Sequence, residues 1–494
     1  MKILFVFYNE GSGLSTHNGI ALLSAIAKQQ GHETKLLHFH DKLDTYKLTS
    51  DWIPDVVAFT ATDFEYAKIN ELAKDMRQWL PEVFFLLGGK SAVEIATKDI
   101  TNSPFNAFCI GEAELSWKAL LKHIKSEDIG NYKVDGFWFK MGNTLYKNPP
   151  GENVKNLDDL PFPDYSIFDM DKIIEAKGGW FNVQFSRGCM YDCTYCYVTA
   201  DKAYQGENYK LRNNSVDYAM RYLEWMVKKY PSIRVFNLDD ELPISIEMQN
   251  GRCNWWLNFC RQFKQQIYDK YNVEFVANGR VNLLTEEIIK TTKEAGCREI
   301  RIGFETGSEN IRFNILKKYI SDEQIENCYK LCNKYGLNTT SFTMIGIPHE
   351  KESDIWETIK MTAKLKPNII RLTFCYPFEN TKLYDYCKQY NLLLEDRLYK
   401  QFGYFEESVI KTIEEQKLNA FRFMFPWFVN LSMLEDIDLL TAYSTMIKIH
   451  LNDDFKQSSV REKIINIDKQ LSDICGNKLH YAYHPNGYFQ FVER

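Results

Sequence analysis

Short apolar runs alternate with segments of helical spacing along the first part of the chain. The runs KILFVF, TKLLHF, DVVAFT, VFFLLGG and AFCIGE have the length and the β-branched or aromatic content of buried strands. Helical patterns lie between them, and the first of these ends at Gly31. Strands joined by crossover helices predict a parallel, doubly wound sheet of the flavodoxin or Rossmann type in residues 1–130.

Ligands of doubly wound sheets bind at the carboxyl ends of the strands. The loops at these ends are polar or rich in glycine, and glycine lets backbone N–H groups approach a ligand closely. We therefore expect a ligand to contact these loops, which are the stretches 9–17, 60–63, 88–91 and 111–112. The candidate contacts within them are Thr60, Thr62, Gly88, Gly89, Gly111 and Glu112.

The pattern changes in residues 131–180, which predict a hairpin turning at 141–143 and then a linker that contains proline. Alternation resumes beyond this boundary, with strands expected at 181–186, 233–238, 273–278, 298–304, 339–345 and 368–375. Six β/α units predict a partial TIM-type barrel in residues 181–385, with its chemistry at the carboxyl ends of the strands. The helical and aromatic residues 386–494 are expected to shape a substrate pocket.

The helix expected over Ser321 to Tyr335 illustrates the pattern of the barrel units. Ser321 and Gln324 have the spacing of a capping box, and Gly336 follows the last turn. Cys328 and Cys332 are ligand types four positions apart, but they share the apolar stripe of this helix. We therefore assign these two cysteines to the core.

Composition narrows the function classes. The 494 residues carry a net charge of −6 and no dense stretch of lysine or arginine, which argues against a nucleic-acid surface. No apolar run approaches the roughly 18–20 residues that span a bilayer, and the first run has no cleavage site, so we expect a cytoplasmic protein. The 12 cysteines show no pairing pattern and predict thiols in a reducing compartment.

The stretch SRGCMYDCTYCY places Cys189, Cys193 and Cys196 within eight residues, directly after a predicted barrel strand. Three readings are open: a zinc site that lacks a ligand, inert buried thiols, or an iron–sulfur cluster with one open iron. A structural zinc ion takes four ligands, and no histidine lies between residues 124 and 348. Three thiolates leave one iron of a four-iron cluster open to a substrate, which favours the cluster.

The CxxxCxxC spacing resembles the radical SAM superfamily. In that family the open iron chelates S-adenosylmethionine, and an electron from the [4Fe–4S] cluster cleaves it to a 5'-deoxyadenosyl radical. The resemblance makes the three cysteines both metal ligands and catalytic residues. It also implies further S-adenosylmethionine contacts, which are Tyr195, Asp239, Asp240, Arg280, Glu305, Ser308, Ile345 and Gly346.

Each of these contacts rests on a motif at the end of a barrel strand. FNLDDE resembles the segment that receives the methionine amino group, and ANGRVN places Arg280 where it would pair with the carboxylate. IRIGFETGSE places Glu305 where the family binds the ribose, and FTMIGIPHE resembles the adenine segment. A helix cap for the aspartates and a surface ion pair for Arg280 are the competing interpretations.

The N-terminal segments THNGIALLSAIAKQQGHE, GGKSA, CIGEAE and NLDDLPFPDY resemble the cobalamin-binding members of this superfamily, in the same order. The resemblance spans residues 1 to about 390 and implies that the first domain binds cobalamin. The DxHxxG loop that supplies a histidine to cobalt in some cobalamin proteins is absent. His17 lies in the first loop, where we favour a helix-capping or solvent-facing role.

The first hypothesis is a cobalamin-dependent radical SAM enzyme that methylates an unactivated carbon through methylcobalamin, acting on a small molecule or peptide. The resemblance implies a one-electron reductant such as flavodoxin or ferredoxin, and no nucleic-acid partner or membrane span is expected. A radical cyclase or rearrangement enzyme of the same family is the alternative. A non-catalytic cobalamin- or metal-binding sensor is the hypothesis from another class.

Overall fold

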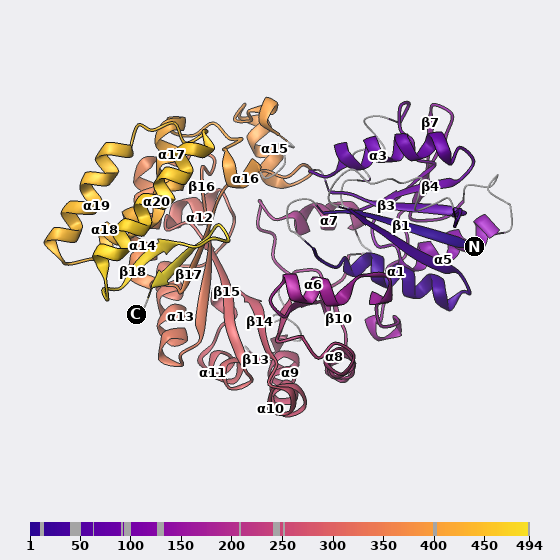
Figure 1. The fold of residues 1–494 in the computed structure, drawn as a ribbon, viewed down its shortest axis with the longest axis horizontal. Helices are drawn as coiled ribbons and strands as arrows, with labels where there is room; N and C mark the ends of the chain where they lie inside the picture. Colours follow the sequence, from indigo (N-terminus) through magenta and orange to yellow (C-terminus); the bar gives the residue numbers. More distant parts are fainter. Residues whose placement is uncertain are drawn as a thin grey trace. The chain divides into compact units, whose positions relative to one another are not determined.

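The chain in the computed structural model separates into two compact units (Figure 1). The first comprises Met1–Arg187 and Asp201–Phe236, and the second comprises Gly188–Ala200 and Asn237–Arg494. The structure describes residues 1–9, 14–39, 51–62, 64–89, 92, 100–125, 133–206, 209–240, 248–249, 252–398 and 403–492. Of the loops predicted to contact a ligand, residues 10–13, 63, 90 and 91 lie outside these ranges.

The first unit is built on a seven-stranded sheet in the order β2-β1-β3-β4-β5-β6-β7. The five predicted strands are confirmed as parallel neighbours: β1 (Lys2–Tyr8), β2 (Glu33–Phe39), β3 (Val56–Thr60), β4 (Phe84–Gly88) and β5 (Ala107–Cys109). Because β2 lies on one side of β1 and β3 on the other, the chain reverses direction across the sheet at β1. Doubly wound sheets bind ligands at this switch point.

The predicted hairpin is formed by β6 (Phe137–Met141) and β7 (Thr144–Lys147), with Met141 paired to Thr144. It extends the first sheet, because β6 pairs antiparallel with β5. The helices of this unit are α1 (Asn18–Gln29), α3 (Tyr66–Trp79), α5 (Glu114–Lys125), α6 (Met170–Ala176) and α8 (Val216–Lys229). Helices α1 and α5 pack together, and the indole Nε1 of Trp117 donates to the carbonyl of Leu23 at 3.1 Å.

The second unit contains most of a second sheet, which is mainly parallel and has the strand order β18-β19-β17-β16-β15-β14-β11. Its parallel strands are β11 (Val235–Leu238), β14 (Glu274–Gly279), β15 (Cys297–Glu305), β16 (Asn338–Ile345) and β17 (Ile369–Phe374). Strand β11 begins in the first unit, where its neighbour is β8 (Trp180–Val183). The six predicted strands therefore follow one another in chain order, as in an open partial barrel.

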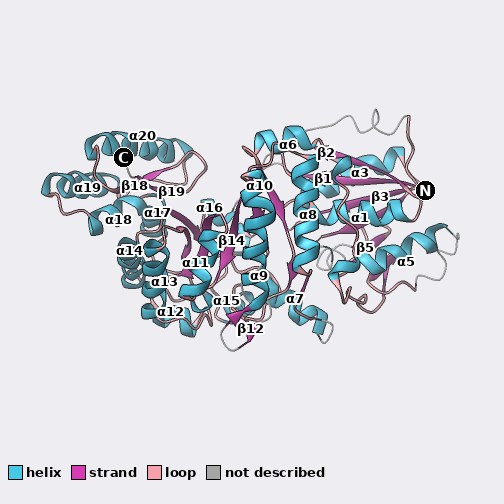
Figure 2. Cartoon of the chain, turned by 90° about the horizontal axis from the view of Figure 1, so that it is seen from below, coloured by secondary structure: helices cyan, strands magenta, loops and turns pink. Residues whose placement is uncertain are grey.

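Several of the helices between these strands pack on one another: α9 on α11, α11 on α13, and α13 on α14 (Figure 2). They are α9 (Asn254–Phe263), α11 (Glu286–Glu294), α12 (Glu309–Asn314), α13 (Asp322–Lys334) and α14 (Glu352–Leu365), and α15 (Lys382–Gln389) follows β17. The predicted capping box at the start of α13 is present, since Ser321 and Gln324 exchange side-chain and backbone hydrogen bonds. Cys328 and Cys332 are buried on this helix.

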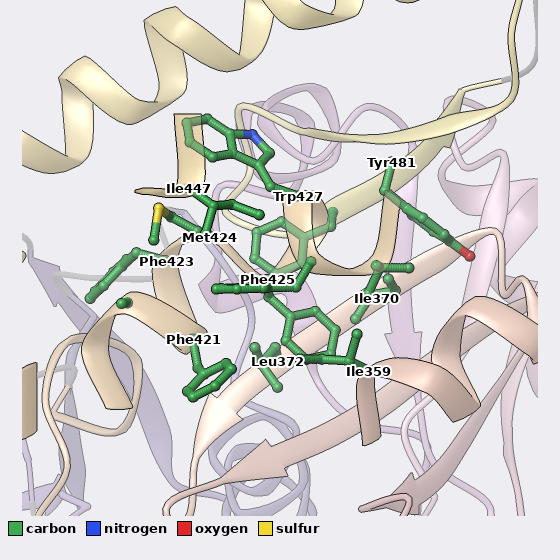
Figure 3. Close-up of a cluster of buried hydrophobic side chains, with 14 of the residues drawn as sticks. Ile359, Ile370, Leu372, Phe421, Phe423, Met424, Phe425, Trp427, Ile447 and Tyr481 are labelled. Atoms are coloured by element: carbon green, nitrogen blue, oxygen red, sulfur yellow. The ribbon is translucent and has the colours of Figure 1, made fainter. Parts of the chain in front are cut away.

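The C-terminal region is helical, with α17 (Glu415–Phe423), α18 (Phe425–Met433), α19 (Ile437–His450) and α20 (Ser458–Cys475). Its aromatic residues form a core against the last barrel strand, where Phe421 and Phe425 gather with Leu372 and Ile370 (Figure 3). Two strands that the sequence analysis did not predict, β18 (His480–Tyr483) and β19 (Phe489–Val492), join the sheet by pairing β19 with β17. Across the described ranges, no helix is long and apolar enough to cross a bilayer.

Candidate functional site

The cysteine segment lies between the short strand β9 (Ser186–Arg187) and α7 (Tyr197–Gln205). The backbone folds into a turn in which the amide of Cys196 donates to the carbonyl of Cys193 at 3.1 Å. Thr194 fixes this turn, because its amide donates to the carbonyl of Leu316 at 3.0 Å and its carbonyl accepts from the amide of Leu383 at 3.0 Å. Backbone from two other segments therefore positions the second and third cysteines.

The three thiols lie close together in the fold. Burial, and to a smaller extent the nearby thiols of Cys193 and Cys189, raise the pKa of Cys196 to about 11. Within the described part of the chain, no three histidine, cysteine or acidic side chains are arranged to hold a single metal ion. An iron–sulfur cluster distributes its thiolates over several irons, and its positive charge offsets the cost of ionising buried thiols. The donor set therefore fits a cluster.

Arg280 brings a positive charge to this segment. It lies directly after β14, it is 7% exposed, and its Nη1 is 3.5 Å from Sγ of Cys193. Its guanidinium stacks over the ring of Tyr191 at 3.9 Å from the centroid, and its Nε donates to Oδ1 of Asn282 at 2.9 Å. The Arg280 guanidinium therefore places a positive charge next to the Cys193 sulfur.

Glu305 ends β15 and forms the centre of a buried polar triad with Lys318 and Tyr195. Nζ of Lys318 donates to Oε1 of Glu305 at 2.6 Å, and the hydroxyl of Tyr195 donates to the same oxygen at 2.9 Å. Lys318 also lies 3.3 Å from the hydroxyl of Tyr195. Burial, and then the Glu305 charge, raises the pKa of Tyr195 well above its usual value, so its hydroxyl stays protonated and donates.

The backbone around Glu305 is specialised for this arrangement. Glu305 has φ +68°, a left-handed conformation that is uncommon for a residue other than glycine. A Cβ atom on Gly303 would overlap Oε1 of Glu305 and crowd Nζ of Lys318, so glycine is required there for the carboxylate to fold back. Strained backbone of this kind clusters at functional sites.

The two aspartates that follow β11 differ in their surroundings. Asp240 is 1% exposed and its carbonyl accepts from Nδ2 of Asn278 at 2.8 Å, which links the ends of β11 and β14. Asp239 is exposed. The residues that follow, 241–247, lie outside the described ranges.

The remaining barrel candidates lie at the ends of β15 and β16. Ser308 is buried at the start of α12, and its hydroxyl donates to Oδ1 of Asp354 at 2.8 Å. Ile345 ends β16, and Gly346 turns the chain with φ +74°. The amide of Gly346 donates to Oε2 of Glu350 at 2.6 Å. Burial raises the pKa of Glu350 to about 8.

Residues 183–362 match the family model described as the radical SAM superfamily. Residues 183–362 therefore form a radical SAM domain. It is 27% identical over 383 residues to a protein named an uncharacterized methyltransferase from Pyrococcus horikoshii, covering 76% of the chain and 79% of the relative. It is 24% identical over 374 residues to the hopanoid C-3 methylase of Methylococcus capsulatus, covering 74% and 67%.

Two solved structures share the fold of this radical SAM protein. TsrM from Kitasatospora setae, with cobalamin and a [4Fe–4S] cluster bound, superposes with a TM-score of 0.64 at 15% identity, covering 78% of each chain. OxsB, with aqua-cobalamin and S-adenosylmethionine bound, superposes with a TM-score of 0.68 at 14% identity, covering 95% of this chain and 75% of OxsB. A radical SAM domain uses a [4Fe–4S] cluster and S-adenosylmethionine as its cofactors.

The loops of the first unit that were predicted to contact a ligand differ in how closely their residues are held by neighbouring groups. Thr60 ends β3, and the amide and hydroxyl of Thr62 both donate to Oε2 of Glu65 at 3.0 Å. Gly88 ends β4, and Gly89 follows with φ +97°. A Cβ on Gly89 would overlap the carbonyl of Ala61, so the ends of β3 and β4 approach each other closely.

The last of these loops holds a dense ionic network. Gly111 has φ +79° and open space where a Cβ would stand, whereas Glu112 pairs with two arginines. Oε2 of Glu112 accepts from Arg187 at 2.7 Å and from Arg212 at 3.0 Å, and Arg212 also pairs with Oε1. Nη2 of Arg187 donates to Oε1 of Glu114 at 2.5 Å. These arginines lower the pKa of Glu112 against the raising effect of its burial.

His17 takes the capping role that we favoured. Its Nδ1 accepts from the amide of Ile20 at 3.2 Å at the start of α1, and its ring packs edge-on against Phe7. Burial lowers the pKa of His17 to about 4, so the ring is neutral and its Nδ1 accepts.

Four further charged residues near these sites are not among the candidates predicted from the sequence: Lys318, Glu350, Arg187 and Arg212. Lys318 stands beside Lys317 in a charged stretch that resembles a solvated helix end, and only the fold shows that it alone is buried. Glu350 is the last residue of the quoted segment FTMIGIPHE, and its spacing of four from Gly346 was the available signal. Arg187 precedes the first cysteine within the quoted cysteine stretch, so attention to charges near the thiols would have found it.

Proposed function

We propose that this radical SAM protein is a cobalamin-dependent enzyme that methylates a carbon atom of a small molecule or peptide. The observation that carries the proposal is the convergence of Tyr195, Glu305 and Lys318 directly beside the three-cysteine segment, within the part of the chain that matches the superfamily. A doubly wound unit precedes this site, and such units present ligand-binding loops at one edge of the sheet.

The barrel residues bind and orient the cofactors. When bound, the [4Fe–4S] cluster supplies the electron that cleaves S-adenosylmethionine to a 5'-deoxyadenosyl radical. Cys189, Cys193 and Cys196 hold the cluster, and Glu305 accepts hydrogen bonds from the ribose hydroxyls of S-adenosylmethionine. Arg280 and the acidic segment at Asp239 and Asp240 bind the methionine carboxylate and amine, because each offers the complementary charge.

Further contacts complete the proposed S-adenosylmethionine site. Tyr195 and the backbone at Ile345 and Gly346 flank the adenine, and Glu350 holds the Gly346 amide in place. Ser308 fixes the loop after Glu305 through its hydrogen bond with Asp354. Residues held in this way keep the reacting groups oriented without reorganisation during the reaction.

The first unit binds cobalamin in this proposal. Cobalamin, when bound, supplies the methyl group that the substrate carbon receives. The close approach of the chain at Gly89 and the open space beside Gly111 allow backbone N–H groups to face a large ligand. Thr60, Thr62 and Gly88 lie at the same edge of the sheet. Glu112 contributes through the loop that it stabilises.

A one-electron reductant such as flavodoxin or ferredoxin completes the proposed reaction. Relatives with two kinds of named activity match the chain, since it is also 22% identical over 408 residues to the anaerobic magnesium-protoporphyrin IX monomethyl ester cyclase of Cereibacter sphaeroides. Cyclisation or rearrangement is therefore the second candidate function. A methylated product gains one carbon, whereas a rearranged product keeps the carbon count of its substrate.

The test is anaerobic reconstitution of the full chain with iron, sulfide and hydroxocobalamin, followed by visible spectra and an assay for 5'-deoxyadenosine. We expect a bound cobalamin spectrum and S-adenosylmethionine cleavage. Replacement of Cys189, Cys193 and Cys196 by alanine should abolish cleavage, whereas Cys328→Ala, a buried thiol on α13, should retain it. Cleavage by the triple variant would contradict the cluster assignment. Failure to retain cobalamin would contradict the first-unit assignment and the cobalamin-dependent methyl transfer that rests on it, but not the cluster.

A further inference from the structure

Two arginines from different helices approach one aromatic ring in the C-terminal region. Arg422 lies on α17 and Arg461 on α20, and the guanidinium carbon of each is 5.4 Å from the ring centroid of Phe423. Arg422 is only 6% exposed, whereas the Arg461 side chain is 24% exposed. The pair therefore extends from the protein surface into the core.

Arg422 lacks a counter-charge. Within the part of the chain that the structure describes, its guanidinium forms no hydrogen bond or ion pair, and its Nε is fully buried. Burial and, to a smaller extent, the like charge of Arg461 lower the pKa of Arg422 to about 10, against an opposing effect of Tyr483. The carboxylate of Glu406 lies 3.7 Å from Arg461 and is itself 55% exposed. Burying a guanidinium without a partner lowers the stability of the folded protein, so the presence of Arg422 at this position requires an explanation.

A third donor faces the same region. The hydroxyl of Tyr483, on β18, is buried without a hydrogen-bond partner among the described residues. The ring of Tyr483 packs edge-on against the ring of Phe489, with 5.1 Å between the centroids. The guanidinium carbon of Arg422 lies 6.0 Å from the centroid of the same Phe489 ring. Burial raises the pKa of Tyr483 well above its usual value, so this phenol remains a donor.

We propose that Arg422, Arg461 and Tyr483 bind the carboxylate or phosphate group of a small molecule. The three groups are donors and two are cationic, and an oxyanion supplies the negative charge that Arg422 lacks and the acceptor that Tyr483 lacks. Guanidinium groups match both oxyanions in geometry. Within α17, Arg422 stands one turn after Leu418, whose Cδ2 lies 3.3 Å from a Cβ placed on Gly346. The helix thus connects the anion site with the end of β16.

The test is thermal unfolding of the reconstituted full chain in increasing inorganic phosphate or acetate, at ionic strength held constant with potassium chloride. The midpoint should rise saturably, by about 3 °C or more, in at least one of the two anions. Arg422→Met should remove this rise and leave the anion-free midpoint at or above that of the wild type, because the variant removes an unpaired buried charge. Arg298→Met, at an exposed arginine paired with Glu274, should keep the response.

A response to neither anion in the wild type would overturn the proposal, as would an equal response in Arg422→Met. Tyr483→Phe keeps the ring and removes only the unpartnered hydroxyl, so it serves where the arginine variant does not fold. We expect its apparent affinity for the anion to fall by about 5–10-fold. An unchanged affinity would also contradict the site. These readouts do not depend on cleavage of S-adenosylmethionine.

Discussion

Lys318 and Glu305 form a buried ion pair, with Nζ and Oε1 separated by 2.6 Å and both residues less than a tenth exposed. The two positions lie thirteen residues apart, and the intervening α12 returns the chain to the end of β15. The pair holds the carboxylate in one orientation beside Tyr195. It also neutralises a charge that burial alone would penalise.

The first prediction concerns Lys318. Lys318→Met leaves the Glu305 carboxylate buried without its cation, so we expect the KM for S-adenosylmethionine to rise at least about tenfold, with a cost to folding of about 3–5 kcal/mol. Lys318→Arg should restore most of the affinity. Kinetics of 5'-deoxyadenosine formation, and the cluster's electron paramagnetic resonance spectrum with S-adenosylmethionine, measure the effect.

The adjacent, exposed Lys317 provides the control. Lys317→Gln should leave both the KM and the spectrum unchanged. A Lys318→Met enzyme that folds and keeps the wild-type KM and spectrum would show that the ion pair serves only the fold.

The second prediction concerns pH and Glu350. Its folded-state pKa of about 8 lies above the unfolded value, so the folded protein binds more protons between these values. The contribution of Glu350 to the free energy of unfolding is fully present below the unfolded pKa of about 4.5. It is lost as pH rises through 8, by up to about 1.4 kcal/mol per pH unit. Glu350→Gln mimics the neutral form and should flatten this dependence.

Denaturant unfolding between pH 5 and 9 measures the change. Glu357→Gln, which replaces an exposed glutamate on α14, should retain the wild-type slope. If Glu350→Gln and the wild type lose stability in parallel above pH 6, Glu350 is ionised in the folded protein and the prediction is wrong.

The third prediction concerns the ionic network of the first unit. Glu112→Gln leaves Arg187 with only Glu114 and removes the acidic partner of Arg212, so we expect a loss of about 3–5 kcal/mol in unfolding free energy. Glu65→Gln, at a half-buried side chain that accepts from Thr62, should cost less than about 1 kcal/mol. Titration of the same variants with cobalamin shows whether Glu112 contacts the ligand directly or only stabilises the loop. A stable Glu112→Gln protein with lost cobalamin binding would assign Glu112 to the ligand.

The fourth prediction contrasts two glycines. Gly89→Ala should destabilise the first unit because its Cβ would overlap the carbonyl of Ala61 and its backbone is left-handed. Gly111→Ala has open space, so only the strain of its positive φ remains, at about 1 kcal/mol. Unfolding free energies of the two variants test this order. Equal losses would show that the close approach of β3 and β4 is unimportant.

The strands were predictable because their apolar runs are short and bounded by polar loops. The same logic located Glu305 and Gly346, since each follows a strand directly. The buried role of Lys318 was not predictable, because its neighbours in sequence do not indicate that α12 folds it back onto β15. The hairpin of β18 and β19 was also missed, because its PNG turn follows a long helical pattern and its strands are only four residues each.

Asn430 on α18 hydrogen-bonds both ways with Tyr481, donating to its carbonyl at 2.8 Å and accepting from its amide at 2.7 Å. In this way a side-chain amide substitutes for a neighbouring strand along the outer edge of β18. Exposed sheet edges recruit strands from other molecules, and proteins avoid this by covering or blocking them. Asn430 therefore occupies backbone groups of β18 that a strand from another molecule would otherwise pair with, which protects this sheet edge from edge-to-edge aggregation.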